Sequence, residues 1–215
     1  DTIDYIIADK IIIPRENEKF YSEKIIRMPN SVACIDKIEI SKESISRRDF
    51  NLPEKGFIFT CFNANKKITS KEFDIWMRLL KGIKGSVLWL YQSNKYSVEN
   101  LIKEAEKRNV DPDRLIFANN LPLKKHLARH KIFDLFLDSF NVNAHTSAVD
   151  CLWAGLPILT KVGNSFSSRI CGSILNSLGL NNLISYSKKE YMNKAIYLGN
   201  NINEIKKIKN LIIKS

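Results

Sequence analysis

The stretch LFLDSFNVNAHTSAVDCLWAGLPILT, residues 135–160, decides the fold class because it reads as a strand, a helix and a second strand. An apolar run at 135–138 precedes a polar loop, a helical pattern covers 146–154 and closes on Gly155, and another apolar run follows at 157–160. Strands that are apolar along nearly their whole length, and that alternate with helices, indicate a parallel sheet covered on both faces.

The same alternation extends through most of the chain. We predict further strands at 4–8, 57–62, 86–91 and 114–118, and further helices at about 69–82, 97–108, 123–131, 165–178, 188–198 and 202–213. Turn residues and weak periodicity set residues 9–54 apart. The expected architecture is α/β: a doubly wound, Rossmann-like lobe over residues 55–215, preceded by a connecting arm over residues 1–54.

The composition, 44% hydrophobic and 27% charged over 215 residues, is that of a globular protein with a sizeable core. The formal net charge of +11 suggests a polyanionic partner, but the lysines are scattered over predicted helix faces and form no single block. Phosphorylated small molecules fit this charge as well as nucleic acid does. A solvated surface without a charged partner is the favoured interpretation.

Cysteine usage and hydropathy indicate a cytoplasmic protein. The four cysteines lie far apart without a CxxC spacing, so we expect reduced and mostly buried thiols. No apolar run approaches the ~18 residues of a membrane span, and the first residues, DTIDYIIADK, carry acids where a signal peptide carries bases. The chain begins without Met, and we expect it to be a piece of a longer protein.

The loops that follow the predicted strands are where a ligand is expected, because open parallel sheets bind ligands beyond the carboxyl ends of their strands. After the strand at 57–62 come Lys66 and Lys67, and then Thr69 or Ser70 as the cap of a helix with Glu72 in its first turn. A lysine at this position neutralises a phosphate as a point charge. Solvated surface remains the alternative for two loop lysines.

The next candidate follows the strand at 114–118, where Pro122 is expected to start a helix. His126 and Arg129 lie three residues apart on that helix and share a face, so an imidazole and a guanidinium would both address one flat ligand such as a nucleobase. A surface helix with assorted basic residues is the alternative.

The third candidate is the helix start within the opening stretch. We expect Thr146 or Ser147 to cap this helix, whose unpaired first-turn amides and dipole suit a phosphate, and His145 to add a donor. Asp150, one turn further, is placed to accept hydrogen bonds from a ribose diol. The residues alone leave open a second interpretation, a capped helix with a first-turn acid and no ligand.

Other features narrow the chemistry. The sequence contains no zinc-ligand spacing and no GxSxG, GxxxxGK[ST] or GxGxxG motif. These absences disfavour an α/β-hydrolase site, a P-loop nucleotide site and a dinucleotide site of the usual kinds. A diphosphate-bearing nucleotide held by a lysine and a helix start, without a metal, suits activated-sugar chemistry. A Gly- and Ser-rich turn at 163–168 is expected to add amides, with Arg169 bracing it. Core packing is expected for Trp76, Trp89 and Trp153.

Five segments, in this order and at these separations, resemble the carboxy-terminal catalytic lobe of the O-linked N-acetylglucosamine transferases, a family with bacterial homologues and plant SPINDLY-type fucosyltransferases. The opening residues 4–31 are also similar to that family's segment joining its two lobes. The five segments are FTCFNANKKIT at 59–69, SVLWLY at 86–91, RLIFANNLPLKKH at 114–126, LFLDSFNVNAHTSAVDCLWAGLPILT at 135–160 and GNSFSSRICGSIL at 163–175.

The resemblance implies a two-lobed, GT-B type, inverting and metal-independent glycosyltransferase that uses UDP-N-acetylglucosamine to modify Ser or Thr of an acceptor protein. Lys67 matches the diphosphate-binding lysine that helps the leaving group depart, and Asp150 matches the ribose-binding acid. The other matches are His126 and Arg129 at the uracil and His145, Thr146 and Ser147 at the diphosphate-binding helix start.

The sequence departs from the family pattern at several positions. Ala64 stands for a glutamine three residues before the lysine, and Leu123 for a lysine after Pro122, which leaves Lys124 or Lys125 as candidates for that ribose contact. Ala144 stands for a glycine, and Ser147 for a second threonine. The family's other lobe, with its acceptor-side histidines, and its tetratricopeptide superhelix are absent from this chain, so no residue here is nominated as the general base.

Two alternatives to the UDP-N-acetylglucosamine prediction follow from the same residues. A GDP-fucose transferase of the SPINDLY kind, or a UDP-hexose transferase, keeps the fold and changes the donor. A basic module that binds nucleic acid without catalysis rests on charge alone, because no aromatic platform is interleaved with the basic residues.

Overall fold

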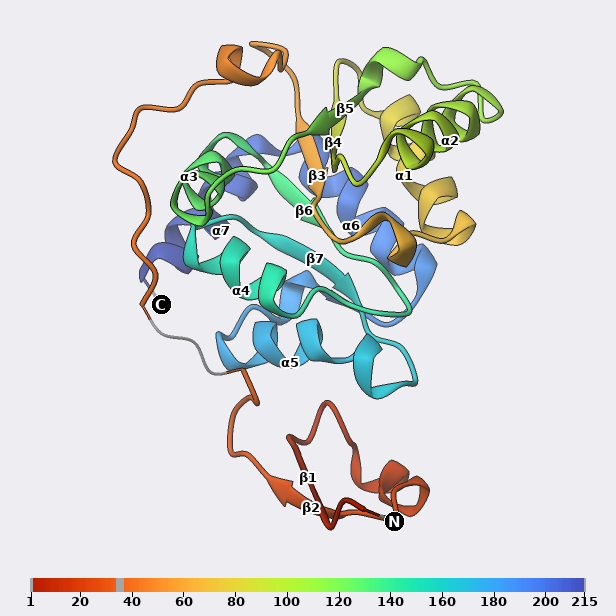
Figure 1. Ribbon diagram of the computed structural model, residues 1–215, viewed down its shortest axis with the longest axis vertical. Coiled ribbons are helices and arrows are strands. Elements are labelled where there is room, and N and C mark those ends of the chain that lie inside the picture. Colours follow the sequence, from red (N-terminus) through yellow and green to blue (C-terminus); the bar gives the residue numbers. More distant parts are fainter. Residues whose placement is uncertain (1, 34–36, 215) are drawn as a thin grey trace.

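The computed structural model describes residues 2–33 and 37–214, and it contains two parallel sheets of unequal size (Figure 1). The larger sheet has six strands in the order β5-β4-β3-β6-β7-β8. Numbered along the chain from β3, this is the 3-2-1-4-5-6 order of doubly wound nucleotide-binding folds. The α/β, Rossmann-like class expected from the sequence is therefore confirmed. The strands are β3 (Ile58–Cys61), β4 (Val87–Tyr91), β5 (Leu115–Ala118), β6 (Leu135–Leu137), β7 (Ile158–Lys161) and β8 (Ile184–Ser185).

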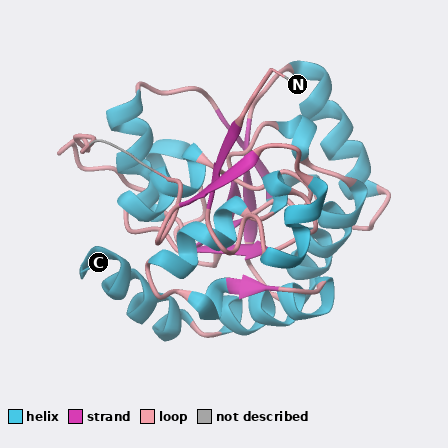
Figure 2. Ribbon diagram, turned by 90° about the horizontal axis from the view of Figure 1, so that it is seen from below, coloured by secondary structure: helices cyan, strands magenta, loops and turns pink. Residues whose placement is uncertain are grey.

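Helices lie on both sides of the strands (Figure 2). In Figure 1, α4 and α5 lie in front of the large sheet and α6 lies behind it. Short 3-10 turns connect several elements, among them η3 (Asn65–Lys67), which follows β3. The helices are α1 (Ser70–Gly82), α2 (Lys95–Glu106), α3 (Leu123–Arg129), α4 (Thr146–Trp153), α5 (Ile170–Ser177), α6 (Lys188–Asn200) and α7 (Ile202–Lys214), and the other 3-10 turns are Arg15–Phe20, Arg48–Phe50, Pro112–Arg114, His130–Ile132, Phe166–Ser168 and Asn181–Leu183.

The sheet strands are apolar along their length because both of their faces are covered. All residues of β3 and β6 are buried, and so are Trp76 and Trp89. The core position expected for Trp153 is wrong: its side chain is 42% exposed, and its indole N–H donates to the carbonyl of Ile38 at 2.8 Å. Through this hydrogen bond, Trp153 links the C-terminal end of α4 to the segment that precedes the lobe.

The smaller sheet pairs β1 (Tyr5–Ala8) with β2 (Lys24–Arg27) in parallel. β2 lies in a region expected to be a connecting arm without strands, and the even shorter β8 was also missed. β2 has only two apolar residues between a lysine and an arginine, and β8 has two residues in all, so no apolar run reveals them. The division into an arm over residues 1–54 and a lobe over 55–215 stays a prediction.

Three smaller expectations can be compared with the structure. Cys61, Cys151 and Cys171 are free and buried as predicted, whereas Cys34 lies outside the described residues. The helix expected at 165–178 is divided, because a 3-10 turn at Phe166–Ser168 precedes α5. No helix in the described ranges is long and apolar enough to cross a membrane, and the cytoplasmic location stays a prediction.

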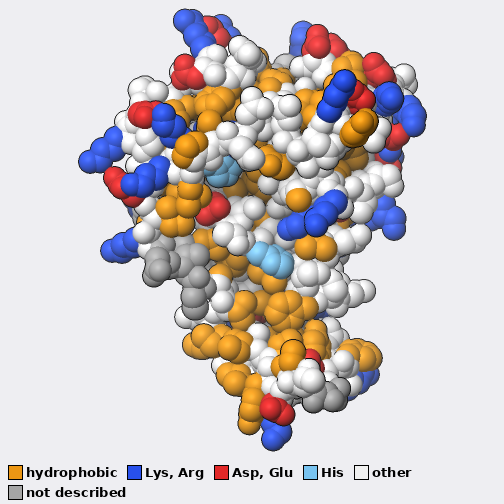
Figure 3. All heavy atoms as spheres, in the orientation of Figure 1, with side chains coloured by type: hydrophobic (Ala, Val, Ile, Leu, Met, Phe, Trp, Pro, Cys, Tyr) orange, Lys and Arg blue, Asp and Glu red, His pale blue; other side chains and the backbone are white. Residues whose placement is uncertain are grey.

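Charged side chains are dispersed over the surface. In Figure 3, Lys and Arg side chains lie mostly around the rim of the visible face, mixed with Asp and Glu, while hydrophobic side chains gather over the part that contains β1 and β2. The net charge of +11 thus forms no continuous basic stripe on this face. The dispersion agrees with the interpretation of most lysines as solvated surface.

Candidate functional site

The order of the strands reverses between β3 and β6, and this reversal determines where a ligand is expected. β3 continues to β4 on one side, and β6 continues to β7 on the other, so the loops that follow β3 and β6 lead away in opposite directions. In open α/β sheets such a switch point leaves a crevice at the carboxyl ends of the two strands. The loop after β3 carries Lys67, and the loop after β6 leads to His145 and α4.

Lys67 bridges these two loops. It ends the 3-10 turn η3 and is half-buried, and its Nζ donates to the carbonyl oxygen of Asn143 at 3.2 Å. No ion pair of Lys67 with a carboxylate occurs in the part of the chain that the structure describes. An ammonium group has three donors, so two of them remain for an anion in the crevice.

The start of α4 supplies further donors. His145 occupies the N-cap position without a side-chain cap bond, and Thr146 is the first helical residue, so the expected cap at Thr146 or Ser147 is wrong by at least one residue. Within residues 2–33 and 37–214, no oxygen accepts a hydrogen bond from the backbone N–H of His145, Thr146 or Ser147. Three consecutive N–H groups at a helix start, with the helix dipole behind them, are an arrangement to which anions bind in proteins.

The imidazole of His145 lies at the same place. Its Nε2 is 3.4 Å from the carbonyl oxygen of Ser167, which belongs to the loop after β7. Burial lowers the pKa of His145 below its usual range, and the nearby Lys67 acts in the same direction. At neutral pH the ring is therefore neutral, and it would serve as a hydrogen-bond donor and not as a cation.

Asp150 lies one turn along α4 from Thr146, on the same face of the helix. Its carboxylate is half-buried and accepts no hydrogen bond within the described ranges, and burial raises its pKa. A carboxylate that is partly desolvated but unpartnered is available to a hydroxyl donor.

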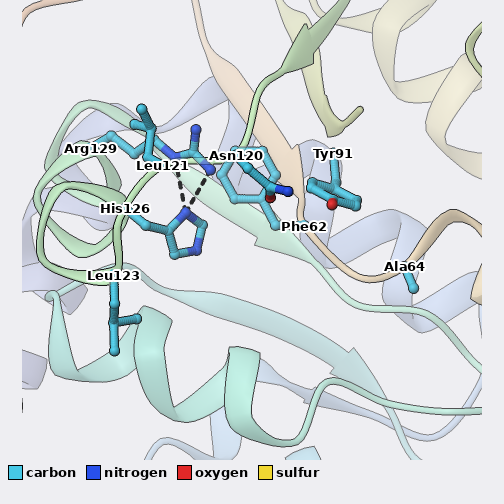
Figure 4. A pocket seen from close by; sticks show the side chains of 8 residues that line it. All are labelled: Phe62, Ala64, Tyr91, Asn120, Leu121, Leu123, His126 and Arg129. Carbon is cyan, nitrogen blue, oxygen red and sulfur yellow. Dashed lines mark hydrogen bonds between the residues drawn. The ribbon is translucent and has the colours of Figure 1, made fainter. Parts of the chain in front are cut away.

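A pocket of about 360 Å³ lies beside the switch point, between the ends of β3, β4 and β5 and the start of α3 (Figure 4). Phe62 lies at its inner wall, and His126 projects into it from α3. One wall is aromatic and the rest combines apolar and polar groups, which is the character of a site for a flat heterocycle. The lining residues are Phe62, Ala64, Tyr91, Asn120, Leu121, Leu123, His126 and Arg129.

The structure brings His126 and Arg129 together, but their roles differ. Arg129 is 2% exposed; its guanidinium lies 4.6 Å from the ring centre of Phe62 and donates to the carbonyl of Asn119 at 2.9 Å. Its Nε and Nη2 lie 3.0 and 2.6 Å from Nδ1 of His126. Since arginine can only donate, Nδ1 accepts and the imidazole proton is assigned to Nε2. Arg129 thus orients His126, which presents an N–H to the pocket.

Burial keeps His126 of α3 and His130, which follows this helix, neutral. Burial and the adjacent Arg129 lower the pKa of His126 to about 4. Burial, with His126 as the next cause, lowers the pKa of His130 to about 3. Both rings are packed with Phe62 in one aromatic cluster, with ring centres 5.5 and 6.0 Å from it.

Replacing His130 by glutamine is expected to flatten the acid side of the stability profile. Below pH 6.5 the unfolded chain binds a proton at this histidine that the folded chain does not, so the free energy of unfolding falls as the pH falls, by up to about 1.4 kcal/mol per pH unit for one histidine. Urea unfolding at pH 6.5 and 4.5 measures this slope. The unsubstituted chain should lose about 1–2 kcal/mol more than H130Q over this interval. Parallel profiles for the two proteins would contradict a buried neutral His130.

Two of the departures from the family pattern lie at this pocket. Ala64 and Leu123 both line it. Lys124 and Lys125, the candidates to replace a lysine at 123, form ion pairs with Glu39 and with Glu43 of the preceding segment. In this structure neither ammonium group is directed to the pocket, which is therefore more apolar on this side.

Sequence reasoning did not identify Phe62, Tyr91, Asn120 and Leu121 as pocket residues. Their one signal is position, because Tyr91 ends β4, Phe62 directly follows β3, and Asn120 and Leu121 lie in the loop after β5. Arg169 also differs from expectation: its Nη1 donates to the carbonyl of Ile11 at 3.1 Å, so it braces the N-terminal segment and not its own loop. Among the described residues there is no group of three or more His, Cys, Asp or Glu that could hold a metal ion.

Known proteins similar in sequence cover most of this chain. Residues 31–215 match the model of the family described as Glycosyl transferase family 41. A relative from Arabidopsis thaliana, named "Probable UDP-N-acetylglucosamine--peptide N-acetylglucosaminyltransferase SEC", is 31% identical over 206 residues, which are 93% of this chain and 21% of the relative. The UDP-N-acetylglucosamine peptide N-acetylglucosaminyltransferase of Caenorhabditis elegans is 32% identical over 173 residues, which are 80% of this chain and 15% of that one. The chain thus spans about a fifth or less of these relatives' length.

The fold has solved counterparts. A mutant of the Thermobaculum terrenum O-GlcNAc transferase superposes with a TM-score of 0.84 at 23% identity, over 98% of this chain and 40% of that one. WaaG, a glycosyltransferase of lipopolysaccharide biosynthesis, superposes with a TM-score of 0.52 at 17% identity, over 98% of this chain and 60% of that one. These likenesses concern the fold alone.

Proposed function

Because the chain belongs to glycosyl transferase family 41, as its sequence predicted, we propose that it is the nucleotide-sugar-binding lobe of an inverting, metal-independent transferase that uses UDP-N-acetylglucosamine to modify Ser or Thr of an acceptor protein. The observation that carries the proposal is that the Lys67 ammonium, from the loop after β3, contacts the Asn143 carbonyl just before the start of α4, where the N–H groups of residues 145–147 have no acceptor in the described ranges.

In this proposal the diphosphate lies between the Lys67 ammonium group and the N–H groups of His145, Thr146 and Ser147. Negative charge grows on the diphosphate as the bond to the sugar breaks, and donors already fixed at that place stabilise it without reorganisation. A lysine and a helix start supply the positive field that a bound metal ion supplies in other enzymes, which supports metal independence.

The uridine is proposed to occupy the pocket between Phe62 and α3. The Nε2–H of His126 donates to a carbonyl oxygen of the base, while Arg129 holds the ring in that tautomer. Asp150 accepts from the ribose hydroxyls. Leu123 in place of a lysine removes one polar contact to the ribose, so binding rests more on the base and the diphosphate.

The acceptor side of the reaction is proposed to belong to a longer parent protein. Parallel sheets are normally covered on both faces, yet Tyr5, Ile7 and Ile26 on the β1–β2 pair are 46–56% exposed. These exposed apolar side chains on the β1–β2 sheet support the proposal that the sheet packs against a further lobe, such as the one that carries the acceptor-side histidines in this family. The general base would come from that lobe, and tetratricopeptide repeats would present the acceptor protein.

Calorimetry with UDP in the presence of EDTA tests the proposal. UDP should bind to the unsubstituted chain without added metal, and GDP should compete poorly with it in saturation-transfer NMR. No UDP binding at millimolar concentration would contradict the proposal. Preferential GDP binding would instead assign a GDP-fucose donor, and tight, steeply salt-dependent binding to random oligonucleotides would point to nucleic acid.

A further inference from the structure

The carboxylate of Asp138 lies directly beneath the loop that joins β6 to α4. Asp138 follows the last residue of β6 and is fully buried. Its Oδ1 accepts from the backbone N–H of Ser139 at 2.8 Å, the backbone N–H of Ala144 at 2.7 Å and the amide of Asn63 at 3.1 Å. Its Oδ2 accepts from the hydroxyl of Thr160 at 2.7 Å. One carboxylate thus accepts from two backbone N–H groups, a side-chain amide and a hydroxyl, and the Cys171 thiol adds a further hydrogen bond.

The carboxylate and its side-chain donors lie at the carboxyl ends of three neighbouring strands. Asn63 follows β3, Thr160 belongs to β7, and Asp138 itself extends β6. The carboxyl ends of the two switch-point strands are therefore tied to one group at the floor of the crevice. A carboxylate accepts several short hydrogen bonds with a fixed geometry, which makes it a rigid anchor.

The hydrogen bond from Ala144 marks a boundary in the backbone. The N–H groups of Ser139 and Ala144 are directed inward to Asp138, while those of the next three residues, 145–147, have no acceptor in the described ranges. The same loop presents the carbonyl of Asn143 to the Lys67 ammonium. The N–H of Ala144, which donates to Asp138, is thus the last one directed into the protein before the three N–H groups that have no acceptor.

A second buried carboxylate strengthens the loop at another point. Oε1 of Glu72, from the first turn of α1, accepts from the backbone N–H of Phe140 at 2.7 Å. Burial raises the pKa of Asp138 to about 6, and its hydrogen-bond donors oppose that rise. An ionised carboxylate here therefore reduces folding stability, so its position next to the crevice calls for a functional reason.

We propose that Asp138 is the positioning residue of the diphosphate site, holding Ala144 and Ser139 so that the Lys67 ammonium and the N–H groups of residues 145–147 converge on one point. The inference rests on the proposed function, since it assigns the role that Asp138 has in UDP binding. Asp138 acts through the loop and does not itself touch the nucleotide.

Two complementary substitutions separate geometry from charge. D138N keeps the shape and retains an acceptor at Oδ1, and Thr160 can rotate its hydroxyl to accept from the new amide. D138E keeps the charge but displaces the acceptor atoms by one methylene. The readout is the ratio of the dissociation constant for uridine to that for UDP, because uridine occupies the base pocket without a diphosphate.

If Asp138 acts by position, the ratio falls about tenfold or more in D138E, equivalent to about 1.4 kcal/mol, and stays within about threefold in D138N. Binding of uridine shows that each variant is folded. An unchanged ratio in D138E, or a fall in D138N as large as in D138E, would overturn the inference.

The matched control is D134N. Asp134 is a buried carboxylate at the opposite end of β6, where it accepts from the backbone N–H of Ile58 at 2.8 Å and from Arg47 at 3.1 Å. This substitution should lower stability and leave the ratio unchanged. A ratio that falls as much in D134N as in D138E would show a general loss of stability and overturn the inference.

Hydrogen exchange of the unsubstituted chain without nucleotide gives a second test, which decides if D138E does not fold. The amide protons of Ser139 and Ala144 should be protected, whereas those of His145, Thr146 and Ser147 should exchange rapidly. Exchange of Ala144 as fast as its three successors would overturn the inference. If this pattern holds but UDP binds no better than uridine to the unsubstituted chain, the proposed function fails and the anchor stands as a structural feature.

Discussion

Replacing Lys67 by alanine is expected to weaken UDP binding by about 10- to 100-fold and to leave uridine binding within about twofold. A hydrogen bond to a charged group contributes about 1.5–3 kcal/mol, and each 1.4 kcal/mol corresponds to a factor of ten in affinity. The Lys67 ammonium is half-buried and has no carboxylate partner in the described ranges, so little of its charge is neutralised before the diphosphate arrives. Calorimetry with UDP and uridine, in EDTA and at fixed salt, measures both values.

Lys66 provides the matched control. It carries the same charge in the same 3-10 turn, but its side chain is exposed. K66A should change UDP affinity by less than about threefold, because exposed charges are screened by solvent and salt. Equal losses in K66A and K67A would mean that only the general charge of the loop matters, and the role assigned to Lys67 would be wrong.

Replacing Trp89 by alanine is expected to lower the free energy of unfolding by about 3–5 kcal/mol, the usual range for an indole removed from a core. Trp89 is 1% exposed and packs among Phe50, Phe62 and Phe133, with ring centres 4.8–5.6 Å away. The guanidinium of Arg129 lies 5.6 Å from its ring, so uridine binding should weaken together with stability. Urea unfolding followed by circular dichroism measures the change.

Trp153 is the control for this prediction. It is 42% exposed and has one hydrogen bond, to the Ile38 carbonyl, so W153A should cost about 1 kcal/mol or less. Equal losses of stability in the two variants would contradict the burial difference between these tryptophans.

The sheet could be predicted because its strands are short, apolar and regularly separated by amphipathic helices. β3, β4 and β6 show this pattern plainly. β2 and β8 could not be found in this way, since β2 carries a charged residue at each end and β8 has two residues. Their pairing depends on distant segments of the chain, which a local pattern does not contain.

The two tryptophans show a similar limit within the helices. Trp76 and Trp153 both lie in apolar helical patterns, but α1 is covered at Trp76 while α4 ends at Trp153. Which face of a helix is covered at its last turn depends on the segment that returns to it. Here that segment contains Ile38, far away in the sequence.

For the candidate site, the sequence predicted which loops contribute residues, but not the role of each side chain in those loops. Lys67 and the start of α4 do meet at the switch point, but helical spacing gave no sign that Arg129 is buried behind His126. The sequence shows Asp138 only as the last residue of a predicted strand, and the partners of its carboxylate come from the loop after β6, from the end of β3 and from β7. Side-chain roles that depend on several strands emerge only once the sheet order is known.

The central claim is that UDP binds across the switch point, with its diphosphate at the start of α4 and its base beside α3. The most direct measurement is a titration of isotopically labelled chain with UDP in EDTA, followed by amide chemical shifts. The account predicts changes concentrated at residues 62–67, 120–126 and 143–147, with uridine reproducing those of the base pocket at 62–64 and 120–126 but not those at 65–67 and 143–147. Millimolar UDP that leaves these amides unmoved, or that shifts a different face of the lobe, would contradict it.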